Sequence, residues 1–585
     1  MPAHTSTLEI PDTSSIMKRF PLKALSKRFS RYKSNGTVYV TTPIFYVNAR
    51  PHLGHLYSML LGDTRVRWEN LKPGQKTMFL TGTDEHGLKI QAVAEKEGID
   101  PKVLVDRVSQ NFVQMAEAVN VKYDRFIRTT DNDHVKAVEH FWNAAMEKGL
   151  IYKGSHSGWY SVSDEAFYPP SQVEDIIDAK TGQPKKVSIE TRNEVVFQEE
   201  ENYFFRLSAF KDKLIDFLEK NPSFVQPSRK YHELLTELRQ EELSDLSVSR
   251  PSWRLKWGIT VPNDDSQKIY VWFDALINYL TAAGYPQQDM PIWPPIHIVG
   301  KDIMRFHCIY WPIFLMAAGI ELPKQVIVHS HWLCDGFKMS KSLGNVVEPI
   351  ELAQYYDPEP LRIYLMEQSN LGTDCNFSEA ALHNHRSKLI NKWANIVSRI
   401  GGDKFDVEQS VQDFFDGKYS DITEMIKRDA VVEAPDQVLL ARDSLVSSIS
   451  SLFSEMDSSM QEFGQMKALH RWWETVELAN VFFQTAQPWV YLKKLTQTQD
   501  ADADAVAEQK TLMNYIIFLT AEAVRVSTIC VLPFMPKTAS GLLDRLGVPD
   551  ETRNKDFAKL GTVKYGKNAN SKHHKPLMRK VESRV

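Results

Sequence analysis

Short hydrophobic runs recur through the first 330 residues of this chain. Val, Ile, Tyr and Phe are concentrated at 37–40, 77–80, 296–299 and 326–329, and each run is followed by glycine or polar residues. Runs of this length and composition are typical of β-strands. We therefore predict four strands that belong to one sheet-containing part of the protein.

The second half of the chain has a different period. From about 391 to 547 the apolar residues recur at spacings of three and four, as in the series Trp472, Val476, Ala479 and Phe483. This spacing places side chains on one face of a helix. Because strand patterns disappear over the same range, we predict a helical bundle.

The stretch 41–62 joins the first predicted strand to a helix, which its apolar spacing from position 56 onward indicates. His52, Gly54 and His55 lie at the turn. A helix N-terminus offers unpaired N–H groups to a phosphate, and a glycine lets a nucleotide approach the backbone. Taken alone, two nearby histidines are more often surface or core residues than ligands.

A second motif follows almost 300 residues later. Lys338, Met339, Ser340, Lys341 and Ser342 form a loop whose two lysines suit a mobile clamp on a polyphosphate. A lysine-rich loop alone would usually be a solvated surface. In this order, the histidine turn and the lysine loop resemble the two signatures of class I aminoacyl-tRNA synthetases. Further stretches between 37 and 547 resemble methionyl-tRNA synthetases in particular.

The resemblance implies an α/β fold: a split Rossmann (HUP-type) catalytic core with an inserted connective domain, followed by an α-helical bundle that binds the anticodon. The insert is too short for a large hydrolytic editing domain. The expected ranges are 1–36 for a transit peptide or disordered basic arm, 37–125 and 258–335 for the two halves of the Rossmann core, 126–257 for the insert, 336–390 for the lysine loop and linker, 391–550 for the helical domain and 551–585 for a basic tail.

The resemblance also implies roles in ATP chemistry. The expected catalytic residues, which would hold the phosphates and the departing pyrophosphate, are His52, His55, Lys338 and Lys341. The expected ATP-binding residues are Gly54, Gly300, Asp302, Trp332, Met339, Ser340 and Ser342. Asp302 follows a strand that ends in glycine, where a carboxylate can accept ribose hydroxyls.

An aromatic stripe predicts where an amino acid would bind. Trp272, Ala275 and Tyr279 share one helical face, and such a stripe alone usually belongs to a core. The resemblance implies instead that it lines a methionine pocket, where a flexible thioether packs well against aromatic rings. The full expected set is Ile44, Tyr46, Asp84, Trp272, Ala275, Tyr279, Phe306 and His307.

Asp84 has two interpretations that the residues alone do not separate. It ends the run 77–84, where ligands bind in α/β sheets, and the resemblance implies that it receives the α-ammonium group of methionine. An aspartate at this point is equally suited to cap the next helix.

Four residues of the helical part are expected to contact the tRNA anticodon by resemblance: Asn391, Asn395, Arg399 and Trp489. Asparagine can read base edges, arginine can hold phosphate, and tryptophan can stack on a splayed base. The alternatives are a solvated helix face for the first three and a core tryptophan at position 489.

The sequence gives little indication of a metal site or of a membrane-spanning helix. The four cysteines are far apart and form no C-x-x-C pair. Ser161 and Asp164 stand where relatives carry zinc-binding cysteines, so we predict no zinc and no other metal site. The most apolar helical stretch, about 516–535, is interrupted by Glu522 and Arg525, so we predict no membrane span.

Both ends of the chain are basic. Between Lys18 and Lys33 there are seven Lys or Arg and no acidic residue, which is typical of a mitochondrial transit peptide. The alternative is a disordered arm that touches RNA, and initiation at either Met1 or Met17 is compatible with the sequence. Residues 551–585 carry a net charge of +7 and predict an extended basic tail able to contact tRNA phosphates.

The implied reaction joins methionine to ATP, accompanied by Mg²⁺, and passes the methionyl group to the 3′-terminal adenosine of tRNA(Met) in the mitochondrial matrix. We expect a monomer without a membrane partner. One alternative is a class I enzyme for another amino acid, such as cysteine. The other is a synthetase-like protein that binds RNA without catalysis, against which the complete histidine and lysine motifs argue.

Overall fold

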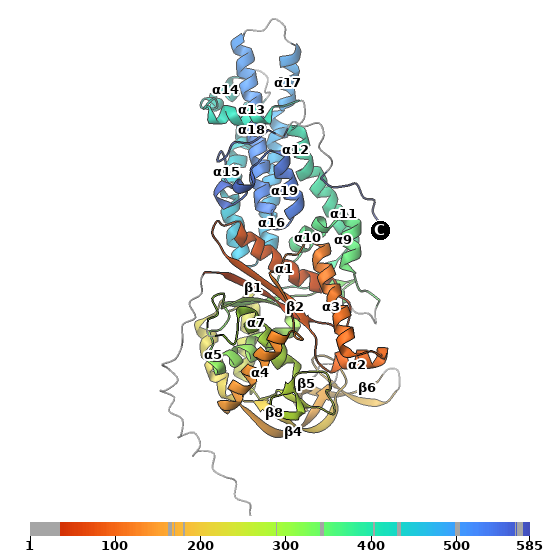
Figure 1. Ribbon diagram of the computed structural model, residues 1–585. Helices are drawn as coiled ribbons and strands as arrows, with labels where there is room; N and C mark the ends of the chain where they lie inside the picture. The colour runs from red at the N-terminus through yellow and green to blue at the C-terminus, as the bar shows by residue number, and fades with distance from the viewer. Residues whose placement is uncertain are drawn as a thin grey trace, which may run out of the picture.

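The computed structural model describes residues 36–161, 166–168, 170–178, 182–287, 289–339, 344–401, 404–429, 434–497, 503–567, 569 and 577–584. The molecule is elongated, with β-sheets at one end and a bundle of helices at the other (Figure 1). The helix α1, which follows the first strand, lies between the two halves.

A six-stranded parallel sheet forms the centre of the first half, in the order β3-β2-β1-β14-β15-β9. Its strands are β1 Val38–Tyr46, β2 Thr77–Asp84, β3 Arg125–Arg128, β9 Val225–Gln226, β14 Ile296–Gly300 and β15 Gln325–His329. The four runs predicted from the sequence form its four central strands. The strand order reverses between β1 and β14, and in such sheets a ligand binds outside the carboxyl ends at this point.

Both faces of this sheet are buried by helices. Val40, Phe79 and Ile298 belong to the hydrophobic core on one face, whereas their neighbours Tyr39 and Leu80 belong to the core on the other face. Successive side chains of a strand point to opposite faces, so burial on both faces explains the continuous apolar runs.

The helices of the first half contribute to one or other of these two cores. They are α1 Leu53–Asn70, α2 Leu88–Glu97 and α3 Pro101–Ala118 in the first core, and α4 Asn132–Glu147, α5 Lys211–Lys220, α6 Ser228–Gln240, α7 Val271–Ala283 and α8 Trp311–Ala318 in the second.

The region between the two halves of the sheet contains three smaller sheets, in the orders β10-β8-β4-β5, β6-β7 and β11-β13-β12. Their strands are β4 Ile151–Ser161, β5 Ala166–Tyr168, β6 Val173–Ile177, β7 Pro184–Ser188, β8 Val196–Phe205, β10 Leu246–Ser247, β11 Ser249–Pro251, β12 Thr260–Val261 and β13 Asp264–Ile269.

Strand pairing crosses the limits that we predicted for the insert. Strands β3 and β9 lie wholly or mostly within 126–257 in sequence, yet they form the two edges of the central sheet. β11 and β13 pair across position 257. A strand as short as β9 contains too few residues to show a pattern, so these pairings could not be read from the sequence.

The second half of the described chain is helical, with no strand after β18 Cys375–Phe377 in the part that the structure describes. Its helices are α9 Pro349–Tyr356, α10 Pro358–Glu367, α11 Glu379–Lys388, α12 Asn395–Ile400, α13 Val407–Phe415, α14 Ile422–Arg428, α15 Pro435–Gln461, α16 Gln465–Ala486, α17 Pro488–Gln497, α18 Ala503–Val531 and α19 Pro536–Arg545. A π-helical turn, Leu389–Ala394, connects α11 to α12. The predicted helical bundle is thus confirmed.

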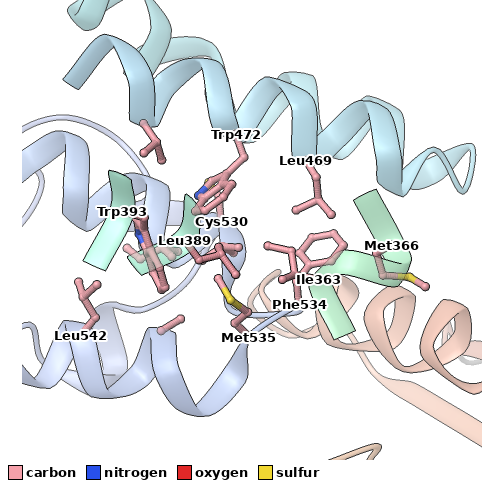
Figure 2. Packing of buried hydrophobic residues seen from close by; sticks show 14 of the residues in the cluster. Ile363, Met366, Leu389, Trp393, Leu469, Trp472, Cys530, Phe534, Met535 and Leu542 are labelled. Atoms are coloured by element: carbon pink, nitrogen blue, oxygen red, sulfur yellow. The ribbon is translucent and has the colours of Figure 1, made fainter. Parts of the chain in front are cut away.

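The core of the bundle is built around large aromatic side chains (Figure 2). Trp472 of α16 lies 5.7 Å from Trp393 between ring centroids, and its Nε1 donates to the Ser527 carbonyl at 2.9 Å. Figure 2 also shows Leu469 of the same helix near Phe534 and Ile363.

One helix of the bundle, α18, is long and apolar enough to cross a membrane, but its apolar window is fully buried inside the protein. Within it, Glu522 and Arg525 form a buried ion pair at 2.7 Å. Arg525 also donates to the backbone carbonyl of Phe557 at 2.6 Å. The pattern of α18 is therefore that of a core helix.

The described part of the predicted basic tail packs against the helices. Tyr565 and Ala569 are buried, Arg579 pairs with Asp357 at 2.9 Å, and Arg584 pairs with Glu379 at 2.6 Å. These contacts use single side chains and backbone carbonyls, so they leave no apolar period in the sequence. Contact of this segment with tRNA stays a prediction.

The helix α1 connects the two halves through its C-terminal part. Asp63 pairs with the fully buried Arg362 of α10 at 2.5 Å. The Trp68 Nε1 donates to Asp457 of α15 at 2.7 Å, and Arg65 donates to the Met460 carbonyl at 2.7 Å. The helix that begins at the histidine turn therefore also forms part of the base of the bundle.

Candidate active site

A cavity of about 370 Å³ opens at the carboxyl ends of β1, β2, β14 and β15. Of the predicted residues, those that line it are Ile44, Tyr46, His52, Gly54, His55, Asp84, Trp272, Gly300, Asp302, Trp332, Lys338 and Met339. It lies at the reversal of strand order, where the fold places a ligand.

The histidine turn forms the N-terminal cap of α1. The Nδ1 of His52 accepts the N–H of Gly54 at 3.1 Å, and the Nδ1 of His55 accepts the N–H of His52 at 3.0 Å. A neutral imidazole whose Nδ1 accepts must carry its proton on Nε2. The backbone thus fixes both tautomers and leaves each Nε2–H available as a donor.

Burial keeps both rings uncharged. Burial, and then the charge of Lys338, lower the pKa of His52 to about 4. Burial, and then the neighbouring His52, lower the pKa of His55 well below its usual value. A side chain at Gly54 would place its Cβ 3.0 Å from the His52 ring, a tight contact that the glycine avoids.

Carboxylate and lysine groups meet on the β14–β15 side of the cavity. Asp302 lies 3.4 Å from the Nζ of Lys338 and 3.4 Å from the Nε2 of His331. Burial alone would raise the pKa of Asp302, but the hydrogen bond with His331 and the charge of Lys338 outweigh it and hold the pKa below its usual range. Lys341, Ser340 and Ser342 lie outside the described residues.

The strand that carries the lysine loop is tied to this side of the cavity. β16 Trp332–Cys334 pairs with β17 Phe337–Lys338 and with β18. Lys301, beside Asp302, binds Asp374 at 2.8 Å, and Asp374 also accepts the backbone N–H of His331 at 2.9 Å. These contacts set the position from which the loop leaves the sheet.

The β2 side of the cavity carries Asp84, Lys89 and Trp272. The helix after Asp84 begins at Leu88 and has Gly87 as its N-cap, so the structure rules out helix capping as the role of Asp84. Asp84 is buried at the end of β2.

Four residues of the predicted methionine site lie outside the cavity lining: Ala275, Tyr279, Phe306 and His307. Three of them, Tyr279, Phe306 and His307, form a support behind the lining. The Phe306 ring stacks on Trp272 at 3.7 Å between centroids. The Tyr279 hydroxyl and His307 Nε2 lie 2.7 Å apart, and His307 Nδ1 lies 2.9 Å from the carbonyl of Ile303, which lines the cavity.

Several lining residues were not predicted, among them Lys89, Ser58, His329, Ser330 and His331. His329 Nε2 lies 2.8 Å from the hydroxyl of Ser58, which joins the end of β15 to α1. A signal was present, because 326–329 was predicted as a strand and polar residues directly after a strand belong at the ligand-binding edge.

The anticodon set lies in the helical half. Asn391, Asn395 and Arg399 are all exposed on the turn and helix that follow α11. Trp489 keeps 39% of its surface exposed at the start of α17, and this helix belongs to the part of the bundle away from the sheet (Figure 1). This exposure contradicts the alternative of a buried core tryptophan.

The parallel sheet, the capped histidine turn and the adjacent lysine strand together define a nucleotide-binding site of the class I synthetase type. A family model described as "tRNA synthetases class I (M)" matches residues 38–401. The mitochondrial methionine–tRNA ligase of Candida albicans is 52% identical, over 95% of this chain and 97% of that protein. The corresponding protein of Saccharomyces cerevisiae is 42% identical, over 94% of this chain and 96% of its own length.

A solved structure agrees with these sequence matches. The Mycobacterium tuberculosis methionyl-tRNA synthetase in complex with methionyl-adenylate superposes with a TM-score of 0.78 at 33% identity, over 93% of this chain and all of that chain. This chain therefore belongs to the methionyl family of class I tRNA synthetases.

Proposed function

We propose that this chain activates methionine with ATP to form methionyl-adenylate and then transfers the methionyl group to the 3′-terminal adenosine of tRNA(Met). The observation that carries the proposal is the cavity, in which the capped histidines lie between a nucleotide side at β14–β15 and an amino-acid side at β2. The names of the relatives, and the adenylate bound to the similar structure, support it.

The first step needs no protein base. A carboxylate oxygen of methionine attacks the α-phosphorus of Mg²⁺-bound ATP, a new P–O bond forms, and pyrophosphate leaves with the electron pair of the broken P–O bond. The Nε2–H groups of His52 and His55 donate to phosphate oxygens as negative charge develops. Lys338 and Lys341 hold the pyrophosphate, and Asp302 accepts ribose hydroxyls. Because both histidines are neutral, they donate without adding charge.

The β2 side selects the amino acid. Asp84 holds the α-ammonium group, and Trp272, on which Phe306 stacks from behind the lining, presents an aromatic surface to the thioether. Tyr279 and His307 support this wall without lining it. A cysteine-specific enzyme would be expected to grip its thiol with a metal, and the described residues contain no group of three metal-ligating side chains.

The helical half reads the tRNA through Asn391, Asn395, Arg399 and Trp489, whose exposure leaves them accessible to bases. The relatives are named mitochondrial, which supports a mitochondrial location, and we place the protein in the matrix because its role is in protein synthesis there. The predicted transit peptide or basic arm, 1–36, lies outside the described residues except for Gly36. We also propose a monomer without a membrane partner.

We propose that the enzyme needs no zinc. Ser161 is buried at the end of β4, where a relative would present a thiol, and Asp164 lies outside the described residues. Elemental analysis of the purified protein tests this directly. About one zinc per chain would contradict it.

ATP–pyrophosphate exchange with a panel of amino acids tests the proposed activity. We expect exchange that depends on methionine. Exchange with cysteine instead would favour the other class I enzyme, and the absence of exchange with every amino acid, together with retained tRNA binding, would favour the non-catalytic RNA-binding protein.

A further inference from the structure

The two sides of the cavity each carry a carboxylate and a lysine. Asp302 and Lys338 lie on the β14–β15 side, and Asp84 and Lys89 lie on the β2 side. The lysines in the lining that the structure describes are Lys89 and Lys338. His52 and His55, which lie between them, are uncharged. Each side of the cavity therefore has its own cation.

Lys89 is held toward the cavity by the start of α2. Gly87, the N-cap of this helix, has a φ of 112° and donates its N–H to the Trp257 carbonyl at 3.2 Å. A residue with a side chain rarely adopts this φ, so the glycine sets the direction in which the helix begins. Lys89, in the first turn, has its Nζ 5.6 Å from the centroid of the Tyr46 ring. A cation over an aromatic face is attracted by the ring, which keeps the ammonium on the amino-acid side.

The chemistry of the substrate requires a cation on this side. An amino acid whose ammonium group lies at Asp84 has its α-carboxylate on the neighbouring carbon, and nearby walls of the cavity are apolar at Ile44, Val271 and Trp272. A carboxylate in such surroundings is strongly disfavoured unless it is paired. Lys89 is the lysine on this side of the lining, whereas Lys338 lies on the nucleotide side, 3.4 Å from Asp302.

We propose that Lys89 binds the α-carboxylate of methionine and orients it for attack on the α-phosphorus. The inference rests on the proposed function, because it takes methionine as the amino acid and Asp84 as the partner of its ammonium group. Lys89 holds one carboxylate oxygen and leaves the other free to attack. Its role is to bring the reacting atoms into line, and it transfers no proton.

Two ligands separate this role from a structural one. L-Methionine carries the carboxylate, whereas L-methioninol has an alcohol in its place and keeps the same ammonium and thioether. Binding of both is measured by calorimetry to the full-length protein and to Lys89→Met, a substitution of similar length without charge. We expect Lys89→Met to weaken methionine binding at least tenfold and to change methioninol binding less than twofold.

The matched control is Lys96→Met, at the exposed end of the same helix, which should leave both affinities and the exchange rate unchanged. Lys89→Arg, which keeps the charge, should recover part of the loss. Melting temperatures of all variants show whether each is folded.

The other outcomes each contradict the proposal. An equal loss for both ligands would mean that Lys89 shapes the cavity without contacting the carboxylate. Unchanged binding and exchange with slower transfer to tRNA would place Lys89 at the acceptor end of the tRNA. A wild-type protein that binds neither ligand would contradict the proposed function itself, so the two failures are distinguishable.

Discussion

At the scale of single residues, the histidine turn shows what a motif does not reveal. The resemblance implied that His52 and His55 hold the phosphates. The structure adds that both Nδ1 atoms accept backbone N–H groups, which leaves the proton of each ring on Nε2. It also gives Gly54 a second role, because a Cβ at this position would lie only 3.0 Å from the His52 ring. These roles depend on ring orientation, which spacing alone does not determine.

Lys341→Ala should slow adenylate formation about 30- to 1,000-fold and leave the affinity for methionine nearly unchanged. The reason is that a clamp on departing pyrophosphate acts mainly in the transition state, where one such contact contributes about 2–4 kcal/mol. Pyrophosphate exchange gives the rate, and calorimetry gives the affinity. The exposed Lys324→Ala serves as the control. A normal rate with weaker methionine binding would contradict the role.

Buried neutral histidines should make the fold sensitive to acid. Burial lowers the pKa of His307 and of His329 to about 4, below the ordinary value near 6.5. As the pH falls from 6.5 toward 4, the unfolded protein takes up a proton on each histidine, whereas the folded protein does not. The free energy of unfolding is therefore highest above pH 6.5 and falls by about 3 kcal/mol for each residue as the pH approaches 4.

The substitution His307→Gln tests this pH dependence. It removes one titrating group and introduces an amide that can form a hydrogen bond with the Tyr279 hydroxyl. Urea unfolding at several pH values should show a smaller loss of stability between pH 6.5 and 4 than in the wild type. An identical slope in the two proteins would mean that His307 does not titrate in this range.

At the scale of elements, α7 is anchored by a buried carboxylate at its first turn. Asp274 lies 2.7 Å from Nδ1 of His86 and 2.8 Å from Nε2 of His134. Burial alone would raise the pKa of Asp274, but the two histidines outweigh it and hold the pKa below its usual value. This arrangement ties the helix that carries Trp272 to the loop after Asp84.

Asp274→Asn should weaken methionine binding and lower the melting temperature, because an amide cannot accept from two histidines as a carboxylate does. A loss of about 1–3 kcal/mol of stability is expected for a buried hydrogen-bonding group left without its partner. ATP affinity should change little, since the nucleotide side rests on other strands. Calorimetric titration with methionine and with ATP measures the two affinities separately. An equal loss of both affinities would contradict the prediction.

The elements also show which parts of the fold could be predicted from the sequence. The four central strands were predictable because burial on both faces forces long apolar runs. Strand β9 was not, because it has two residues and is defined only by pairing with β15. The packed C-terminal segment was missed for a related reason, since Arg579 and Arg584 make isolated contacts that leave no period. Cavity residues on β15 needed the sheet order, which places His329 next to α1.

At the scale of the whole molecule, the candidate active site and the residues proposed to contact the tRNA anticodon lie in different halves of the protein. The cavity lies at the carboxyl ends of the central strands, and the exposed Trp489 belongs to α17, in the part of the bundle away from the sheet (Figure 1). A change at one end can therefore be tested for its effect on each step separately.

Trp489→Ala should reduce tRNA charging about 5- to 150-fold and leave methionine-dependent exchange intact. Stacking on a base contributes roughly 1–3 kcal/mol, and each 1.4 kcal/mol is a factor of ten. Because Trp489 is 39% exposed, its removal should lower the melting temperature less than removal of a fully buried tryptophan would. Val103→Ala, at an exposed apolar position of α3 in the other half, is the control. Parallel losses of exchange, charging and melting temperature would mean that Trp489 is structural.

The attachment of α1 has a mechanical consequence. Its polar anchors to the bundle, Asp63, Arg65 and Trp68, all lie in its second half, whereas His52 lies at the opposite end. With 18 residues, the helix is about 27 Å long, and its first half is held by the sheet through the hydrogen bond between Ser58 and His329. It therefore links the bundle at one end to the edge of the cavity at the other. A displacement of the bundle along this link would reach the histidine turn, where a shift of about 1 Å can change a reaction rate about a hundredfold.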